Sequence, residues 1–248
     1  MKITLLGTGD APGTPIIGCH CPTCNDARKG TKSQRLRSSL LVESETGKVL
    51  VDTGPDLRAQ LLKIGVEHVD GVIWTHGHYD HFTGFAEFHR VQRKVDVYGV
   101  TETLDYIIDY LSFLGPSRHD IALYEPFELI GLKFTLFGVR HRPSKNPIGV
   151  VIQEGERKVV FTGDCESLFP EKSLEVMDRP DLLIADAIVP DLTKFHIKKH
   201  MDAIQAMELG ERIQAKNIVL THLSHYFKPH EEASKDFPLG YDGMQFEV

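Results

Sequence analysis

The sequence predicts an αββα sandwich, two packed β-sheets with helices on their outer faces, although hydrophobic periodicity alone defines only the broader class α/β or α+β. Three observations support this prediction. Ten short segments rich in β-branched residues recur along the 248 residues. Helical stretches lie between them in both halves of the chain. Two connections contain the glycine-bearing turns of β-hairpins, so some of the strands are antiparallel.

The expected strands are apolar segments bounded by turn residues. In chain order they are 2–7, 38–44, 48–54, 70–76, 95–100, 132–139, 148–153, 158–164, 181–188 and 217–223. The turns in "ESETGKV" and "QEGERKV" predict two hairpins. Helices are expected over 55–65, 101–115 and 201–215. No linker or repeat divides the chain, so we expect a single domain over 1–248 with a cysteine-rich insertion at about 18–30.

The charge and composition of the chain limit the kinds of partner that it is expected to bind. The chain has 28 Lys and Arg against 35 Asp and Glu, a net charge of −7, which disfavours a surface that grips nucleic acid. No apolar run reaches the length of a membrane span, and the apolar start is too short for a signal peptide. We therefore expect a cytoplasmic protein with no membrane partner. The sequence leaves the oligomeric state open, including a homodimer.

The segment "GCHCPTCNDARKG", residues 18–30, holds three of the four cysteines and is called the cysteine loop below. In a reducing compartment clustered cysteines bind metal more often than they form disulfides. Cys19, Cys21 and Cys24 also lie too close together for an ordinary disulfide framework. The cysteine loop therefore predicts a thiolate metal site.

The most informative stretch is "WTHGHYDHFTG", which places His76, His78, Asp80 and His81 within six residues directly after an apolar run. Alternate residues of an extended segment share a face, so His76, His78 and Asp80 can converge. A turn at Asp80 and His81 could then supply a second ion. Surface histidines after a strand are the alternative, but their density beside glycine and aspartate favours a metal site.

Further metal-binding side chains follow other predicted strands. A single His or Asp at such a position is usually solvated or caps a helix, but together these residues complete a two-metal site. They are His141 in "GVRHRP", Asp164 in "VVFTGDCE", and His222 and His225 in "IVLTHLSH".

Asp52 in "VLVDTGP" has two interpretations that the sequence leaves open. Its carboxylate could accept the free ring N–H of a ligand histidine and fix its tautomer. Alternatively, it could cap the helix that starts near Pro55.

The HxHxDH motif, followed by strand-end His, Asp and His, resembles the metallo-β-lactamase superfamily from "LLGTGDAPGTP" to "GYDGMQF". This resemblance implies the αββα sandwich and two divalent ions. It implies that one ion is held by His76, His78 and His141, the other by Asp80, His81 and His222, and that Asp164 bridges them.

His200 opens a predicted helix in "KKHMDAIQAMELGERI" and resembles the HxxxxxA element with which the phosphodiesterase branch places a histidine over the metals. A histidine that only begins a helix is the alternative. With the cysteine loop, "THLSH" and "GYDGM", the set resembles the phosphoribosyl cyclic phosphate phosphodiesterases of the carbon-phosphorus lyase pathway. One departure is that Arg142 and Pro143 separate His141 from the "SK" pair, so the family's other substrate contacts are not carried over.

That resemblance implies a small phosphodiester substrate such as 5-phosphoribosyl 1,2-cyclic phosphate. It also implies manganese or zinc in the catalytic pair and a structural zinc on Cys19, Cys21, Cys24 and His225. The residues themselves also favour His225 as the fourth zinc ligand over the remaining cysteine, Cys165. In an extended segment the neighbour of Asp164 points to the opposite face of the sheet, so Cys165 is expected to be a core residue. His225 lies three residues beyond His222, and His20 is expected to be exposed.

The expected mechanism follows from charge. Two divalent ions held by Asp80 and Asp164 would lower the pKa of a bridging water to about 7 and stabilise in-line attack by the resulting hydroxide. His200 would act as the general acid that protonates the departing alkoxide.

Three rival interpretations remain. A tRNA 3′-end endonuclease shares HxHxDH and the extra histidine, but the net charge of −7 and the lack of a basic arm count against it. A quinone-cofactor biosynthesis protein also carries an early cysteine cluster and would act by hydrolysis or oxidation on a peptide-derived precursor. A non-catalytic zinc-binding interaction module would leave the seven-residue His and Asp set without a role.

Overall fold

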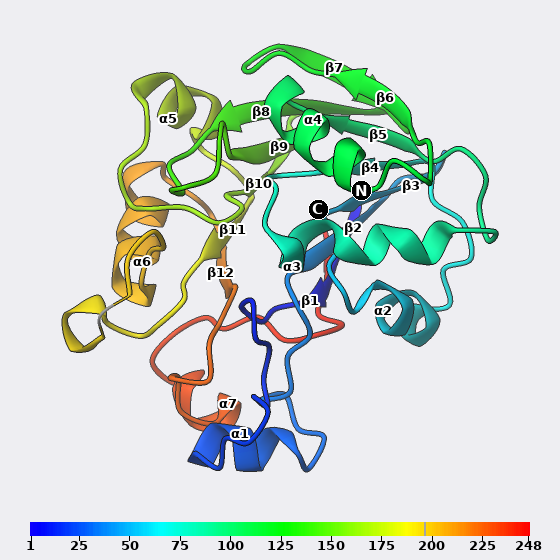
Figure 1. Ribbon diagram of the computed structural model, residues 1–248. Helices are drawn as coiled ribbons and strands as arrows, with labels where there is room; N and C mark the ends of the chain where they lie inside the picture. The colour runs from blue at the N-terminus through cyan, green and yellow to red at the C-terminus, as the bar shows by residue number, and fades with distance from the viewer. Residues whose placement is uncertain (196) are drawn as a thin grey trace.

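The computed structural model describes residues 1–195 and 197–248 and contains two β-sheets (Figure 1). The first has the strand order β13-β1-β2-β3-β4-β5-β6 and the second β12-β11-β10-β9-β8-β7. The strands of the first sheet are β1 (Lys2–Gly7), β2 (Ser39–Glu43), β3 (Lys48–Val51), β4 (Gly71–Ile73), β5 (Asp96–Gly99), β6 (Ser117–Asp120) and β13 (Gln245–Glu247). Those of the second are β7 (Pro126–Leu129), β8 (Leu132–Gly138), β9 (Ile148–Glu154), β10 (Arg157–Phe161), β11 (Leu182–Asp186) and β12 (Ile218–Thr221).

Both predicted hairpins are confirmed. Strands β2 and β3 pair antiparallel with Glu43 opposite Lys48, and β9 and β10 pair antiparallel with Glu154 opposite Arg157. Strand β1 also pairs antiparallel with β2 and β13, and β8 with β7 and β9. The neighbours from β3 to β6 in the first sheet and from β10 to β12 in the second are parallel. Because parallel strands end at the same edge of a sheet, loops far apart in the sequence meet there.

Three apolar clusters fill the spaces between the layers. One contains Ile3 and Phe134 and lies between the two sheets. Another, with Trp74, lies under α2 (Leu57–Ile64), η1 (Thr83–Phe88) and α4 (Thr101–Tyr110), and the third lies under α5 (Glu171–Met177) and α6 (Ala203–Arg212). Figure 1 shows α5 and α6 on the opposite side of the sheets from α2. The predicted αββα sandwich is therefore confirmed.

Of the helices, only α2, α4 and α6 were predicted. Besides α5 and η1, the helices that were not predicted are short: α1 (Pro22–Ala27), α3 (Tyr79–Phe82), η2 (Leu192–Lys194) and α7 (His230–Ala233). Strands β6, β7 and β13 were also missed. All three are sheet edges, and their exposed polar residues hide the apolar pattern that marks a strand. Within the described residues, no helix has the length and apolarity needed to cross a membrane.

Candidate metal centres

The predicted histidine and aspartate ligands gather at the edge where the parallel strands end. Their ligand atoms form two groups, and within each group all of these atoms lie within 4.8 Å of one another. The first group is His76, His78, His141 and Asp164, and the second is Asp80, His81, Asp164 and His222. Asp164 belongs to both, and all seven residues are at least partly buried.

The backbone conformation of the "THGHYDH" segment at this site differs from the extended one that was expected. Strand β4 ends at Ile73, and His76 and His78 follow in irregular backbone. Asp80 does not continue this segment. It lies in helix α3 with His81 and joins the second group, whereas the alternation of an extended chain predicted that it would converge with His76 and His78. The helical turn separates the two groups of ligands.

Hydrogen bonds to Nδ1 orient three of the rings. Nδ1 of His81 donates to Asp52 Oδ2 at 2.6 Å, and Nδ1 of His141 donates to the carbonyl of Lys199 at 2.8 Å. Nδ1 of His76 lies 3.0 Å from Thr75 Oγ1, whose hydroxyl donates to the same Asp52 oxygen at 2.7 Å. In each of these rings Nε2 therefore remains available to bind a metal ion. Carboxylates and carbonyls around metal sites commonly orient the ligand histidines in this way.

Asp52 therefore supports two histidines, one directly and one through a hydroxyl. Its side chain is fully buried, and Thr75 N–H donates to its other oxygen at 2.8 Å. The N-cap of α2 is Asp56, so the capping interpretation of Asp52 is wrong.

Asp164 lies between the two groups. Its Oδ2 is 3.2 Å from His81 Nε2 and 3.7 Å from both His76 Nε2 and His141 Nε2, and its Oδ1 is 3.2 Å from His222 Nδ1. The buried atoms His76 Nε2, His81 Nε2 and His222 Nδ1 have no hydrogen-bond partner in the described part of the chain. Buried polar atoms without partners are costly, so their convergence on one carboxylate fits a site built for cations.

Protonation states fit the same conclusion. Burial lowers the pKa of His76, His78 and His222, and lowers that of His141 to about 4, so these rings are neutral and can ligate. His81 differs. Burial opposes its charge, but Asp164, Asp80 and Asp52 together raise its pKa well above the ordinary value. The three carboxylates thus attract positive charge to the position that a metal ion would take.

His200 lies against this cluster, although not at the start of a helix. Helix α6 begins at Ala203 with Asp202 as its N-cap, so His200 belongs to the preceding loop. Its ring stacks on His222 with centroids 4.9 Å apart and meets His141 edge-on at 4.7 Å. Nδ1 of His200 donates to Asp186 Oδ2 at 2.9 Å. Burial opposes the charge of the ring, but Asp186 raises its pKa to about 9.

Sequence reasoning missed two acidic residues at the site, Asp186 and Asp10. Asp186 is fully buried at the end of β11 and holds His200. Asp10 is 6% exposed, and its Oδ1 has no hydrogen-bond partner in the described residues. Burial and the charge of Asp80 raise the pKa of Asp10 to about 7. The signal resembled the one used elsewhere: Asp10 follows an apolar strand, and Asp186 is the last residue of one.

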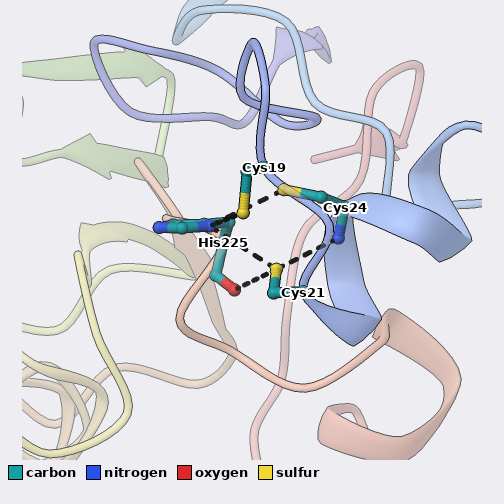
Figure 2. Close-up of side chains that lie close together, drawn as sticks. All are labelled: Cys19, Cys21, Cys24 and His225. Carbon is teal, nitrogen blue, oxygen red and sulfur yellow. Dashed lines mark hydrogen bonds between the residues drawn. The ribbon is translucent and has the colours of Figure 1, made fainter.

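The cysteine loop forms a separate site with His225 (Figure 2). The Sγ atoms of Cys19, Cys21 and Cys24 lie 3.3, 3.5 and 3.6 Å from His225 Nδ1. A tetrahedral zinc with ordinary Zn–S and Zn–N bonds would separate sulfur from nitrogen by about 3.5 Å. The four donors therefore fit a closed zinc site.

Local structure explains this arrangement. Cys21 is the N-cap of α1, and its Sγ accepts the Cys24 N–H at 3.4 Å. Ile16 N–H points to Cys24 Sγ at 3.4 Å, and burial lowers the pKa of His225, which favours the neutral ring. Cys165 is fully buried among the apolar residues under α5 and α6, and His20 is exposed, both as predicted.

Comparisons with known proteins agree with this architecture. Residues 48–223 match the family model described as the beta-lactamase superfamily domain, so the chain belongs to the metallo-β-lactamase superfamily. A crystal structure of a diphosphatase from the PhnP family has a TM-score of 0.87 and 28% identity, covering 100% of this chain and 97% of that one.

Two curated relatives are longer than this chain. An octanoyltransferase of Porphyromonas gingivalis is 31% identical over 99% of this chain and 51% of its own length. A coenzyme PQQ synthesis protein B of Ruegeria pomeroyi is 33% identical over 63% of this chain and 56% of its own length. The chain thus spans about half the length of these curated relatives.

Proposed function

We propose that the chain is a metal-dependent phosphodiesterase that hydrolyses small cyclic phosphodiesters such as 5-phosphoribosyl 1,2-cyclic phosphate. One observation carries this proposal: two four-residue ligand groups share Asp164, and His200 lies against both of them. Two adjacent cation sites beside a proton donor suit a reaction in which a phosphate is attacked on one side and loses an alkoxide on the other.

The seven ligands would hold two divalent ions, zinc or manganese. When bound, such ions lower the pKa of water and neutralise charge on a phosphoryl group. The protein's own part is orientation. Asp52 and the Lys199 carbonyl fix the tautomers of His81 and His141, and Asp164 provides an oxygen to each group.

His200 would supply the proton for the departing alkoxide. Its Nδ1–H is committed to Asp186, so Nε2 is the nitrogen left for a substrate oxygen. The carboxylate of Asp186 also favours the charged ring, which must carry the proton before it can donate it. Asp186 thus acts as a positioning residue for His200.

The cysteine site would hold one structural zinc. Replacing Cys21 with alanine should remove this zinc, measured as a loss of about one equivalent per chain, and lower the melting temperature by about 2–4 °C for each kcal/mol of stability lost. Cys165→Ala is the matched control, because it removes a buried thiol that has no part in the site. If Cys21→Ala abolished turnover while zinc content and melting temperature stayed unchanged, the structural assignment would be wrong.

A substrate panel tests the proposed activity. The metal-loaded protein is assayed on bis(p-nitrophenyl) phosphate, a 2′,3′-cyclic nucleotide, a ribosyl 1,2-cyclic phosphate, a dinucleoside diphosphate, an acyl thioester and a precursor tRNA. We expect turnover of the small diesters. The similar structure's description as a diphosphatase is the reason for including the diphosphate.

The rival functions predict different results in the same panel. Turnover of the precursor tRNA alone would indicate the endonuclease, and turnover of the thioester or the diphosphate alone would overturn the diesterase proposal. The PQQ synthesis protein B relative keeps the quinone-cofactor interpretation as a second candidate, which predicts no turnover of any phosphate ester. An interaction module would bind zinc and hydrolyse nothing.

A further inference from the structure

A groove of about 720 Å³ opens beside His78, outside the ligand groups themselves. Helix α4 forms one wall, and Pro143 to Lys145 form part of the other. His78 connects the groove to the metal site, and its Nε2 lies 3.3 Å from Ser144 Oγ. This volume lies in the range of small-molecule pockets, so a phosphate held at the histidines could extend its substituent into the groove.

Tyr106 provides a flat aromatic surface in this groove. Its ring packs over Gly77, where an added Cβ would lie 2.6 Å from Tyr106 Cδ1, and Phe82 meets it edge-on with centroids 6.1 Å apart. The side chain is nevertheless 58% exposed. A ring that is held on one side and open on the other can stack on a planar ligand at little entropic cost.

The wall formed by α4 is rich in hydrogen-bond acceptors. Glu102 and Asp109 lie seven residues apart on one helix face, and neither forms an ion pair in the described part of the chain. Asp105 is already paired with Arg118 at 2.6 Å. Thr103, only 2% exposed, also lines the groove, and its Oγ1 has no hydrogen-bond partner among the described residues.

These charges select among possible substituents. The carboxylates of Glu102 and Asp109 repel a second phosphate group, and among the described residues only Lys145 brings an amine to the groove. Groups that donate N–H bonds are favoured, because a carboxylate accepts such bonds strongly. The groove therefore suits a planar group that carries amino substituents.

We propose that this groove binds the base of a nucleoside phosphodiester, stacked on Tyr106 with its amino group directed to Glu102 or Asp109. The inference rests on the proposed phosphodiesterase function and narrows its substrate class. Among the small diesters proposed above, it favours a nucleoside diester over 5-phosphoribosyl 1,2-cyclic phosphate, because the two carboxylates repel the additional phosphate of the latter.

The test compares esters that share one leaving group. Cytidine 5′-(p-nitrophenyl phosphate) carries a base, and methyl p-nitrophenyl phosphate does not. Tyr106→Ala should raise KM for the cytidine ester roughly tenfold, with little change in kcat and no change for the methyl ester. Tyr106→Phe should behave like the unaltered protein, because stacking needs only the ring.

Tyr110→Ala is the matched control. Tyr110 lies one turn further along α4, is 63% exposed and meets Phe82 at 5.3 Å, but it does not line the groove. The double variant Glu102→Gln, Asp109→Asn should reduce the preference for the cytidine over the uridine ester by about fivefold. Equal effects of Tyr106→Ala on both esters, or equal effects of the Tyr106 and Tyr110 variants, would overturn the inference.

A binding measurement separates this inference from the proposed activity. Affinity for cytidine 5′-monophosphate is measured by isothermal titration calorimetry, whose signal does not depend on Tyr106 itself. If no diester is hydrolysed but Tyr106→Ala alone weakens binding, the activity is wrong and the groove assignment stands. If diesters are hydrolysed and Tyr106→Ala leaves both KM and binding unchanged, the groove assignment is wrong.

Discussion

Replacing His200 with alanine is expected to slow hydrolysis of a diester with an alkoxide leaving group by about 10²–10⁴-fold. An alkoxide leaves poorly without a proton, whereas p-nitrophenolate leaves readily. The p-nitrophenyl ester should therefore lose much less activity. Steady-state kinetics on the two esters, at matched metal content, measure this difference.

The control is His68→Ala, which removes an exposed imidazole whose only ion-pair partner is Asp70 in the described residues. It should leave both rates unchanged. Equal slowing of the alkyl and aryl esters by His200→Ala would contradict the general-acid role. It would instead indicate that His200 supports His141 and His222, on which its ring packs.

The second large effect is expected at Asp164. Asp164→Ala removes the one carboxylate common to both ligand groups, so the protein should bind fewer than two ions. Activity should fall by more than the roughly 10–100-fold loss that follows removal of an outer hydrogen-bond partner. Metal analysis after dialysis and kcat/KM on bis(p-nitrophenyl) phosphate measure the two effects.

Asp164→Asn separates charge from shape, because the amide keeps the size of the side chain and loses its charge. It should resemble Asp164→Ala in metal content. Asp181→Asn is the control for removal of a carboxylate, since Asp181 pairs with Lys216 at 2.6 Å on the surface. Two tightly held ions in Asp164→Ala would show that Asp164 does not bridge.

The sequence predicts all seven residues of the two ligand groups, because they lie in a dense motif or directly after apolar strands. This holds even where a strand is shorter than predicted. Strand β4, for example, ends at Ile73 and not at His76, and the ligands still follow it directly. The alternation of an extended segment placed Asp80 with His76 and His78, whereas the resemblance placed it with His81 and His222, which is the group that the structure shows. A single helical turn at α3 rotates it away from His76, and four residues carry no periodicity from which to predict a helix.

Asp186 and Asp10 could not be singled out for a different reason. Each is a single acid at or just after the end of a strand, a position shared with caps and solvated loops. Their importance arises from contacts across the sequence: Asp186 meets His200 from another segment, and Asp10 is affected by the charge of Asp80. Likewise, Tyr106 is an ordinary helix residue in the sequence, and only the packing of α4 over Gly77 places it at the groove.

The cysteine site has a consequence for how the chain is made. His225 lies 206, 204 and 201 residues after Cys19, Cys21 and Cys24. At about 5–20 residues per second, a ribosome needs roughly 10–40 s to synthesise the intervening chain. During that interval the three thiols have no histidine partner from this site. Newly made protein therefore passes through a period in which these cysteines are open to oxidation or to other metals, and this period ends when the segment that contains His225 emerges from the ribosome.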